Sequence, residues 1–218
     1  MPDEQNALYN PLAISGIAES VVRELFSRAC HPLTTLGRFS GAGVYAVYYR
    51  GDFAEYAPIA YANQQACVTP IYVGKAIPKG GRKGVIAGDG GSPLFGRLTQ
   101  HAESLSVATN LRVEDFLCRY LSVEELFIEI AERQLIQQFK PVWNVCLDGF
   151  GNHDPGKGRY GGQRPGWDEV HPGRAWATKR QPSRLSAVEW RAAIREYLAR
   201  VEAGLIHEVV AVDDGDED

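Results

Sequence analysis

Arg97 and His101 have the clearest potential for chemistry, because they lie four positions apart in a segment with helical periodicity. Side chains at i and i+4 share one face of a helix, so both can reach a common ligand. For an isolated pair, two unrelated solvent-facing side chains would be the commoner interpretation. The pair therefore gains weight only from the polar residues that accompany it.

Four further polar residues stand before and after this predicted helix. Tyr45 and Tyr72 lie in short β-branched and aromatic runs that predict strands. Glu132 falls inside a later predicted helix, which Pro141 ends, and Asn144 follows. Taken singly, such residues are usually a half-buried aromatic, a solvated acid and a turn former. Their order and their company are more informative than any one of them.

Charge is segregated along the chain. The sequence has 218 residues and a formal net charge of −4, but five of its 27 acids lie between Asp213 and Asp218. Between Pro155 and Arg195, nine Lys and Arg residues stand against three acids. This local surplus is large enough to bind phosphates, although basic residues that merely solvate a surface are the alternative.

Helices and strands alternate in a way that predicts how these residues are positioned. Helices are predicted over 11–29, over 93–106, from a Ser122 cap to about Lys140, and over 186–204. Strands are predicted over 44–49, 70–73 and 113–121. The order strand, strand, helix, strand, helix predicts one compact mixed α/β unit.

The stretch 149–182 differs from the rest because it holds eight glycines and four prolines. This composition predicts a long functional excursion that does not join a packed core. The chain then divides into a helical extension (1–40), a mixed α/β core (41–148), a basic excursion with a last helix (149–212) and an acidic tail (213–218).

Cysteines and apolar runs indicate the compartment. The four cysteines are Cys30, Cys67, Cys118 and Cys146. They form no Cys-x-x-Cys pair, which argues against a zinc site and favours isolated, reduced thiols in a cytoplasmic protein. No run approaches the ~20 apolar residues of a membrane-spanning helix, and the N-terminus does not have the pattern of a signal peptide.

Together the polar residues resemble the signature of the GIY-YIG nuclease family. The matching positions are Gly43-Val44-Tyr45, Tyr72-Val73-Gly74, Arg97 with His101, Glu132 and Asn144, within about 41–148. Val replaces Ile in both triplets, and the 27 positions between the two tyrosines imply an insertion that loops out. The resemblance implies an α+β fold with a small three-stranded mixed or antiparallel sheet flanked by helices.

Two flanking strings narrow the resemblance. Gly151-Asn-His-Asp154 and the stretch from Gly166 to Arg174 are similar to restriction enzymes of this superfamily that cut the palindrome CCGCGG. They imply double-stranded DNA as substrate, a homodimer that cuts both strands, and no organic cofactor. His153 and Asp154 as a second metal site is an alternative, but such a pair in a glycine-rich loop is more often a turn.

The resemblance also implies a role for each candidate. Tyr45 would deprotonate or orient the attacking water, which requires nearby positive charge because an unperturbed tyrosine has a pKa of about 10. Arg97 would clamp the scissile phosphate. Glu132 would hold one Mg²⁺, for which Mn²⁺ can substitute.

The remaining candidates would support these three. Tyr72 and His101 would complete the hydrogen-bond network, Asn144 would bond a backbone group or side chain, and Lys75 would add positive charge. DNA contacts are expected from basic residues in two segments, together with Lys75. They are Lys79, Arg82 and Lys83 in the first, and Lys157, Arg159, Arg164, Arg174, Lys179 and Arg180 in the second.

Two other functions stay open. One is a GIY-YIG nuclease of repair or of a mobile element, which shares the chemistry. The other is a non-enzymatic DNA-binding protein that has kept the fold.

Overall fold

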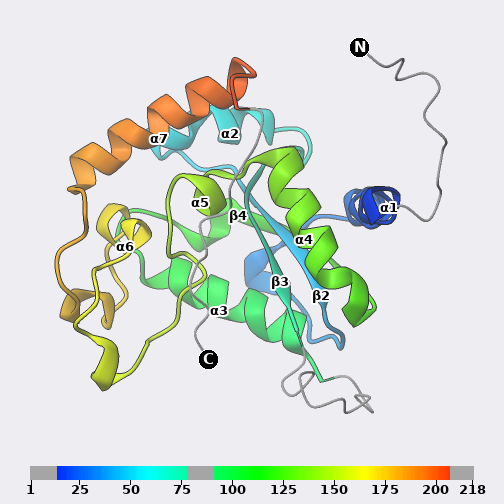
Figure 1. Ribbon diagram of the computed structural model, residues 1–218, viewed down its shortest axis with the longest axis horizontal. Coiled ribbons are helices and arrows are strands. Elements are labelled where there is room, and N and C mark those ends of the chain that lie inside the picture. Colours follow the sequence, from blue (N-terminus) through cyan, green and yellow to red (C-terminus); the bar gives the residue numbers. More distant parts are fainter. Residues whose placement is uncertain (1–13, 78–90, 207–218) are drawn as a thin grey trace.

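The computed structural model describes residues 14–77 and 91–206 (Figure 1). One four-stranded sheet has the order β1-β4-β2-β3, and every neighbouring pair is antiparallel. The strands are β1 (His31–Pro32), β2 (Gly43–Tyr49), β3 (Pro70–Ala76) and β4 (Phe116–Ser122). The predicted mixed α/β fold is confirmed, and the two-residue β1 adds a fourth strand to the predicted three.

The α-helices in the described part of the chain are α1 (Ile14–Ser27), α2 (Ala57–Ala62), α3 (Pro93–Val107), α4 (Glu125–Phe139), α5 (Val142–Val145), α6 (Gly166–Val170) and α7 (Ala187–Glu202). The four long ones agree with the predicted helices, whereas the short α2, α5 and α6 were not predicted. The predicted Ser122 cap is wrong, because Ser122 ends β4 and Glu124 takes the N-cap position of α4.

The sheet has two apolar faces. On one face, Val44, Ala46 and Tyr48 pack against α1 and α4, which also contact each other. On the other face, Val47 and Tyr49 belong to the larger core, which also takes residues from α3, α5, α6 and α7. Alternation of β2 side chains between two covered faces explains why all seven residues of that strand are buried.

The Gly/Pro-rich stretch packs into the larger core, so the prediction that it stays outside is wrong. Phe150, Trp167 and Val170 are at most 1% exposed and lie in the same cluster as Trp190 and Ile194 of α7. A few large aromatic side chains bury enough area to anchor a segment that is otherwise poor in apolar residues. Figure 1 shows this part of the chain (yellow to orange) along one side of the molecule, where α6 contacts α7.

The predicted insertion between Tyr45 and Tyr72 does not loop out, so this prediction is wrong. It forms α2 and the short helical turn Ala54–Tyr56, and it buries Phe53, Tyr56 and Ile59. The Tyr56 hydroxyl hydrogen-bonds with His171 Nε2 (2.7 Å) and accepts from Trp143 Nε1 (2.9 Å). The insertion therefore ties the core to the C-terminal segment.

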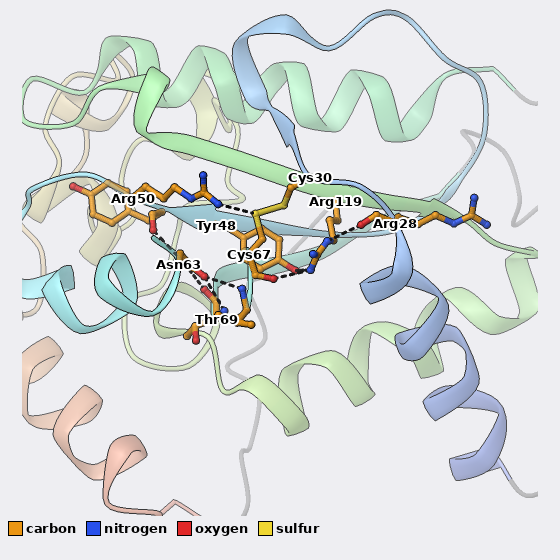
Figure 2. Close-up of a disulfide and its surroundings, with 10 residues drawn as sticks. Arg28, Cys30, Tyr48, Arg50, Asn63, Cys67, Thr69 and Arg119 are labelled. Carbon is orange, nitrogen blue, oxygen red and sulfur yellow. Dashed lines mark hydrogen bonds between the residues drawn. A yellow bond between two sulfur atoms is a disulfide. The ribbon is translucent and has the colours of Figure 1, made fainter. Parts of the chain in front are cut away.

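A disulfide joins Cys30 and Cys67, which corrects the expectation of four reduced thiols (Figure 2). Cys118 and Cys146 are free. Because the bond links residues 37 positions apart, sequence spacing did not reveal it. The reasoning from reduced thiols to a cytoplasmic location loses its basis. No helix among the described residues is long and apolar enough to cross a membrane.

Arg119 organises the surroundings of the disulfide. Figure 2 shows its guanidinium donating to the carbonyl oxygens of Arg28 (2.8 Å) and Cys67 (2.7 Å). The same group lies 5.4 Å above the ring of Tyr48. The end of α1 and the loop before β3 are thus joined by a covalent bond and by a cation that binds both backbones.

Candidate active site

Tyr45 and His101 form a buried pair at the centre of the candidate site. β2 presents the tyrosine to the face of the sheet that α3 covers, and its hydroxyl lies 2.6 Å from His101 Nε2. Burial lowers the pKa of His101 well below its usual value, and the charge of Arg97 adds to this effect. The imidazole is therefore neutral near pH 7, and its Nε2 can accept the tyrosine proton.

The phenol of Tyr45 is also protonated. Burial raises the pKa of Tyr45 to about 12, although the charge and hydrogen bond of Arg97 and the hydrogen bond of Tyr72 act to lower it. Glu132 raises it further through its negative charge. The positive charge expected around this tyrosine is present, but its effect on the pKa of Tyr45 is smaller than that of burial. Tyr45 is therefore a neutral phenol, and not a phenolate, in the resting site.

Gly74 explains how the tyrosine ring fits. Tyr45 and Gly74 are directly opposite in the β2–β3 pairing. A Cβ on Gly74 would lie 2.4 Å from the Tyr45 hydroxyl oxygen and 2.6 Å from Cζ. The glycine of the second signature triplet therefore leaves the space in which the tyrosine of the first triplet lies.

Glu132 and Lys75 form the acidic and basic wall of the site. Lys75 Nζ lies 2.9 Å from Glu132 Oε2 and 2.7 Å from Glu129 Oε2. Burial lowers the pKa of Lys75, but the hydrogen bonds and charges of the two carboxylates outweigh burial and raise it. Lys75 is thus a permanent cation beside the carboxylate that is the metal-ligand candidate. Sequence reasoning did not include Glu129, although its i, i+3 spacing from Glu132 was visible.

The donors fit a magnesium ion only in part. No group of three or more His, Cys, Asp or Glu side chains that would hold a metal occurs among the described residues. A single half-buried carboxylate suits Mg²⁺, which keeps several waters and takes further oxygens from substrate phosphates. Glu132 is therefore an adequate ligand for a metal whose remaining ligands come from water and from the phosphates of a substrate. It is not enough for a structural metal site, in which protein side chains supply all the ligands.

Asn144 lies behind the site. Its side-chain amide accepts from the Val73 N–H (2.8 Å) and donates to the Val73 carbonyl (2.9 Å). Val73 is the residue between Tyr72 and Gly74, so this pair of bonds fixes the strand that carries both. Asn144 itself is 8% exposed.

A wall of the site comes from a segment that sequence reasoning did not include among the catalytic parts. The Phe150 ring stacks on His101, with centroids 4.5 Å apart and planes 14° apart. His153 hydrogen-bonds with Arg97 Nη1. The string Gly151-Asn-His-Asp154 was the available signal, but it did not reveal what the segment contacts.

Arg174 fixes the backbone of this segment from the side away from the site. Its guanidinium donates to both carboxylate oxygens of Asp168 (2.6 and 2.5 Å) and to the carbonyls of Gly149, Phe150 and Asn152. The side chain is 4% exposed and lies against the rings of Trp167 and Trp176. The predicted role of Arg174 was a DNA contact, but every one of these partners lies within the fold.

The other predicted DNA-binding residues fall into four groups. Lys157, Arg159 and Lys179 are exposed, while Arg164 pairs with Glu169 (3.0 Å) and Arg180 donates to the Gly162 carbonyl. Lys75 belongs to the site, as described above. Lys79, Arg82 and Lys83 lie outside the described residues.

The fold and the site define a class of nuclease. Two paired antiparallel strands each carry a signature tyrosine, and α3 and α4 bring Arg97, His101 and Glu132 to them. This arrangement is that of a GIY-YIG nuclease core.

Comparison with known families agrees with this class. Residues 37–198 match the Eco29kI GIY-YIG domain. Because the match covers more than half of the chain, the protein belongs to the Eco29kI family of GIY-YIG nucleases of the restriction endonuclease type. No curated protein matched the sequence.

Proposed function

We propose that this protein is a metal-dependent type II restriction endonuclease that hydrolyses double-stranded DNA at a GC-rich palindrome, CCGCGG. The observation that carries the proposal is the Tyr45–His101 pair, with Arg97 and Glu132 close enough to shift the pKa of Tyr45. Hydrolysis of a phosphodiester needs a deprotonated water, a stabilised phosphate and a neutralised leaving oxygen. The site holds candidates for the first two, and a metal on Glu132 would serve the third.

Tyr45 and His101 would activate the water as a relay. Because the pKa of Tyr45 is about 12, its phenol does not act as a preformed base near neutral pH. With the His101 proton on Nδ1, the phenol would donate to Nε2 of the neutral imidazole, 2.6 Å away. As a water attacks the phosphorus, the tyrosine oxygen takes the water proton while its own proton passes to His101 Nε2. The tyrosine thus remains a general base in function without a standing negative charge.

Arg97 and Lys75 would supply positive charge to the phosphate. The planar fork of an arginine matches two phosphate oxygens, and the hydrogen bond between Arg97 and Tyr45 places this fork beside the attacking oxygen. Lys75 is already a cation on the Glu132 side of the site. Two fixed cations around one phosphate stabilise its developing charge without reorganisation.

Glu132 would hold Mg²⁺, or Mn²⁺ in its place. When bound, the ion acts as a Lewis acid on the phosphate and neutralises the leaving 3′-oxygen. To bind the ion, Glu132 would have to give up its ion pair with Lys75. The second carboxylate, Glu129, lies 2.7 Å from the same ammonium and would keep Lys75 in the site.

DNA binding is assigned to the exposed basic residues of the C-terminal segment. Lys157, Arg159 and Lys179 would contact phosphates, which gives affinity without sequence information. Arg174 would not contact DNA itself. It would hold the C-terminal segment in place from within the fold, since its partners are Asp168 and three carbonyls. A homodimer would cut both strands of the palindrome, one strand per chain.

A plasmid digest tests the proposal. Wild type, Glu132→Gln and the matched control Glu129→Gln are each incubated with magnesium and with EDTA. Both glutamates pair with Lys75, but only Glu132 is assigned to the metal. We expect discrete bands with magnesium from wild type and also from Glu129→Gln, because the glutamine oxygen can still accept from Lys75. We expect none from Glu132→Gln or in EDTA.

Other outcomes would favour the alternatives. Single nicks at lesions without discrete bands would indicate a repair nuclease. DNA binding without cleavage of GC-rich palindromes in any metal would indicate a non-enzymatic binding protein. Cleavage by Glu132→Gln at the wild-type rate would show that the metal is held elsewhere.

A further inference from the structure

The contact between His153 and Arg97 gives the C-terminal segment a direct connection to the phosphate-binding group. An arginine guanidinium can only donate hydrogen bonds, so the bond from Arg97 Nη1 requires His153 Nε2 to accept. The imidazole is therefore neutral in this contact, with its proton on Nδ1. His153 is an exposed residue of a glycine-rich loop, and its side chain nevertheless contacts Arg97.

The backbone that carries His153 is fixed on both sides. Toward the site, a Cβ on Gly151 would lie 2.8 Å from the Tyr72 hydroxyl oxygen and 3.1 Å from Arg97 Nη2, so the chain passes directly against both groups. On the far side, Arg174 Nη1 donates to the Asn152 carbonyl at 2.9 Å. His153 directly follows the last carbonyl that Arg174 holds, so its position is set by the fold.

We propose that His153 is a positioning residue that holds the Arg97 guanidinium in the orientation that binds the scissile phosphate. This inference rests on the proposed nuclease function. A long arginine side chain loses conformational freedom when it binds, and a side chain that is already oriented loses less. Tyr45 constrains the guanidinium from β2, and His153 constrains Nη1 from the segment that Arg174 anchors.

Cleavage kinetics separate this role from a purely structural one. Single-turnover rates and DNA affinity in Ca²⁺ are measured for His153→Ala and for His153→Gln, whose amide oxygen can still accept from Arg97. Because misplacing a catalytic group by about 1 Å can cost on the order of 100-fold, we expect His153→Ala to lower the rate by roughly 10- to 100-fold. His153→Gln should recover most of the rate, and DNA affinity should stay near the wild-type value in both.

A double-mutant cycle tests whether the effect passes through Arg97. In an Arg97→Lys background the donor to His153 has lost its planar fork, so His153→Ala should cause little further loss of rate. An equal loss in both backgrounds would overturn the proposal. So would a wild-type rate for His153→Ala, or a loss of DNA affinity that accounts for the whole change.

A spectroscopic measurement keeps the inference testable apart from nuclease activity. The ¹⁵N chemical shifts of the His153 imidazole, at mildly alkaline pH without DNA, report which nitrogen carries the proton. We expect the Nδ1–H tautomer in wild type and a shift toward the free-imidazole mixture in Arg97→Ala, while exposed His31 stays unchanged as the control. Identical His153 shifts in both proteins would overturn the contact. If wild type cleaves no DNA, the proposed function fails, but these shifts still decide the contact.

Discussion

Tyr45 depends on the absence of a side chain opposite it. Its ring crosses the backbone of Gly74, where a Cβ would approach the hydroxyl oxygen to 2.4 Å. This hydroxyl also makes the 2.6 Å contact with His101, so any rotation of the ring away from β3 lengthens that hydrogen bond or bends it. The spacing of the second triplet, Tyr72-Val73-Gly74, thus places a tyrosine and a gap on the same strand.

Gly74→Ala should therefore disable the site without unfolding the protein. No left-handed backbone angle is required at Gly74, so the methyl group acts only by displacing the Tyr45 ring. We expect the single-turnover cleavage rate to fall by about 100-fold, the scale of a 1 Å misplacement, with DNA affinity in Ca²⁺ nearly unchanged.

Gly96→Ala is the matched control for this substitution. Gly96 lies in α3, and a Cβ there would meet nothing within 4 Å. An alanine in a helix interior is favourable relative to glycine by about 0.5–1 kcal/mol, so this variant should be at least as stable as wild type and fully active. Wild-type cleavage by Gly74→Ala would mean that the ring position is not critical.

The long elements were predictable from local pattern, and the short ones were not. Alternating and β-branched runs predicted β2, β3 and β4, because sheet strands need such residues on both covered faces. By contrast α2, α5 and α6 have six residues or fewer and depend on tertiary contacts, such as Trp167 of α6 in the core.

For the polar side chains, too, sequence pattern predicted only part of what the structure shows. Order along the chain was enough to select Tyr45, Arg97, His101 and Glu132, which the structure brings together. Charge alone could not separate a buried cation from an exposed one, so Arg174 was grouped with surface residues although it pairs with Asp168 inside the fold. A disulfide between distant residues also leaves no local pattern.

The Cys30–Cys67 disulfide connects α1 to the loop before β3, and its contribution can be measured. Closing a loop between residues 37 positions apart restricts the unfolded chain, which the chain-entropy relation values at up to about 4 kcal/mol. We expect Cys30→Ser with Cys67→Ser to lower the free energy of unfolding in urea by about 2–4 kcal/mol. Cleavage activity should persist, since neither cysteine contacts the site.

Alkylation followed by mass spectrometry is the accompanying check. In denaturant without reductant, Cys118 and Cys146 should be modified, and Cys30 and Cys67 only after reduction. The double Ser variant of the two free cysteines serves as the control, because it should keep the disulfide. Four modified cysteines in unreduced protein would show that the disulfide does not form.

Across the whole molecule, one buried hydrogen-bond chain joins the core to the C-terminal segment. His171 Nδ1 lies 2.9 Å from Asn110 Oδ1 and donates to it, while Nε2 accepts from Tyr56. Tyr56 in turn accepts from Trp143. Every member of the chain has a partner, and the imidazole must be neutral to serve both sides. The segment that carries the proposed Arg97 support is thus attached to the core through a titratable group, His171.

His171 should make the free energy of unfolding depend on pH. Burial, with a smaller effect from the charge of Arg191, lowers the pKa of His171 to about 3, whereas an unfolded histidine has a pKa of about 6.5. Above pH 6.5 neither state is protonated, and the full stability is present. As the pH falls toward 3 the unfolded chain binds a proton that the folded protein excludes. The free energy of unfolding should therefore fall by about 1.4 kcal/mol per pH unit from this residue.

Urea unfolding at pH 7 and pH 5 measures the effect, with His171→Gln as the variant and His31→Gln as the exposed control. Because the glutamine cannot titrate, His171→Gln should be less stable than wild type at pH 7 but should lose about 2 kcal/mol less on acidification. His31→Gln should follow the wild-type dependence. His101 also has a lowered pKa and titrates in all three proteins, so the difference between slopes isolates His171. Equal slopes for wild type and His171→Gln would mean that the C-terminal segment opens and hydrates His171 before the sheet unfolds.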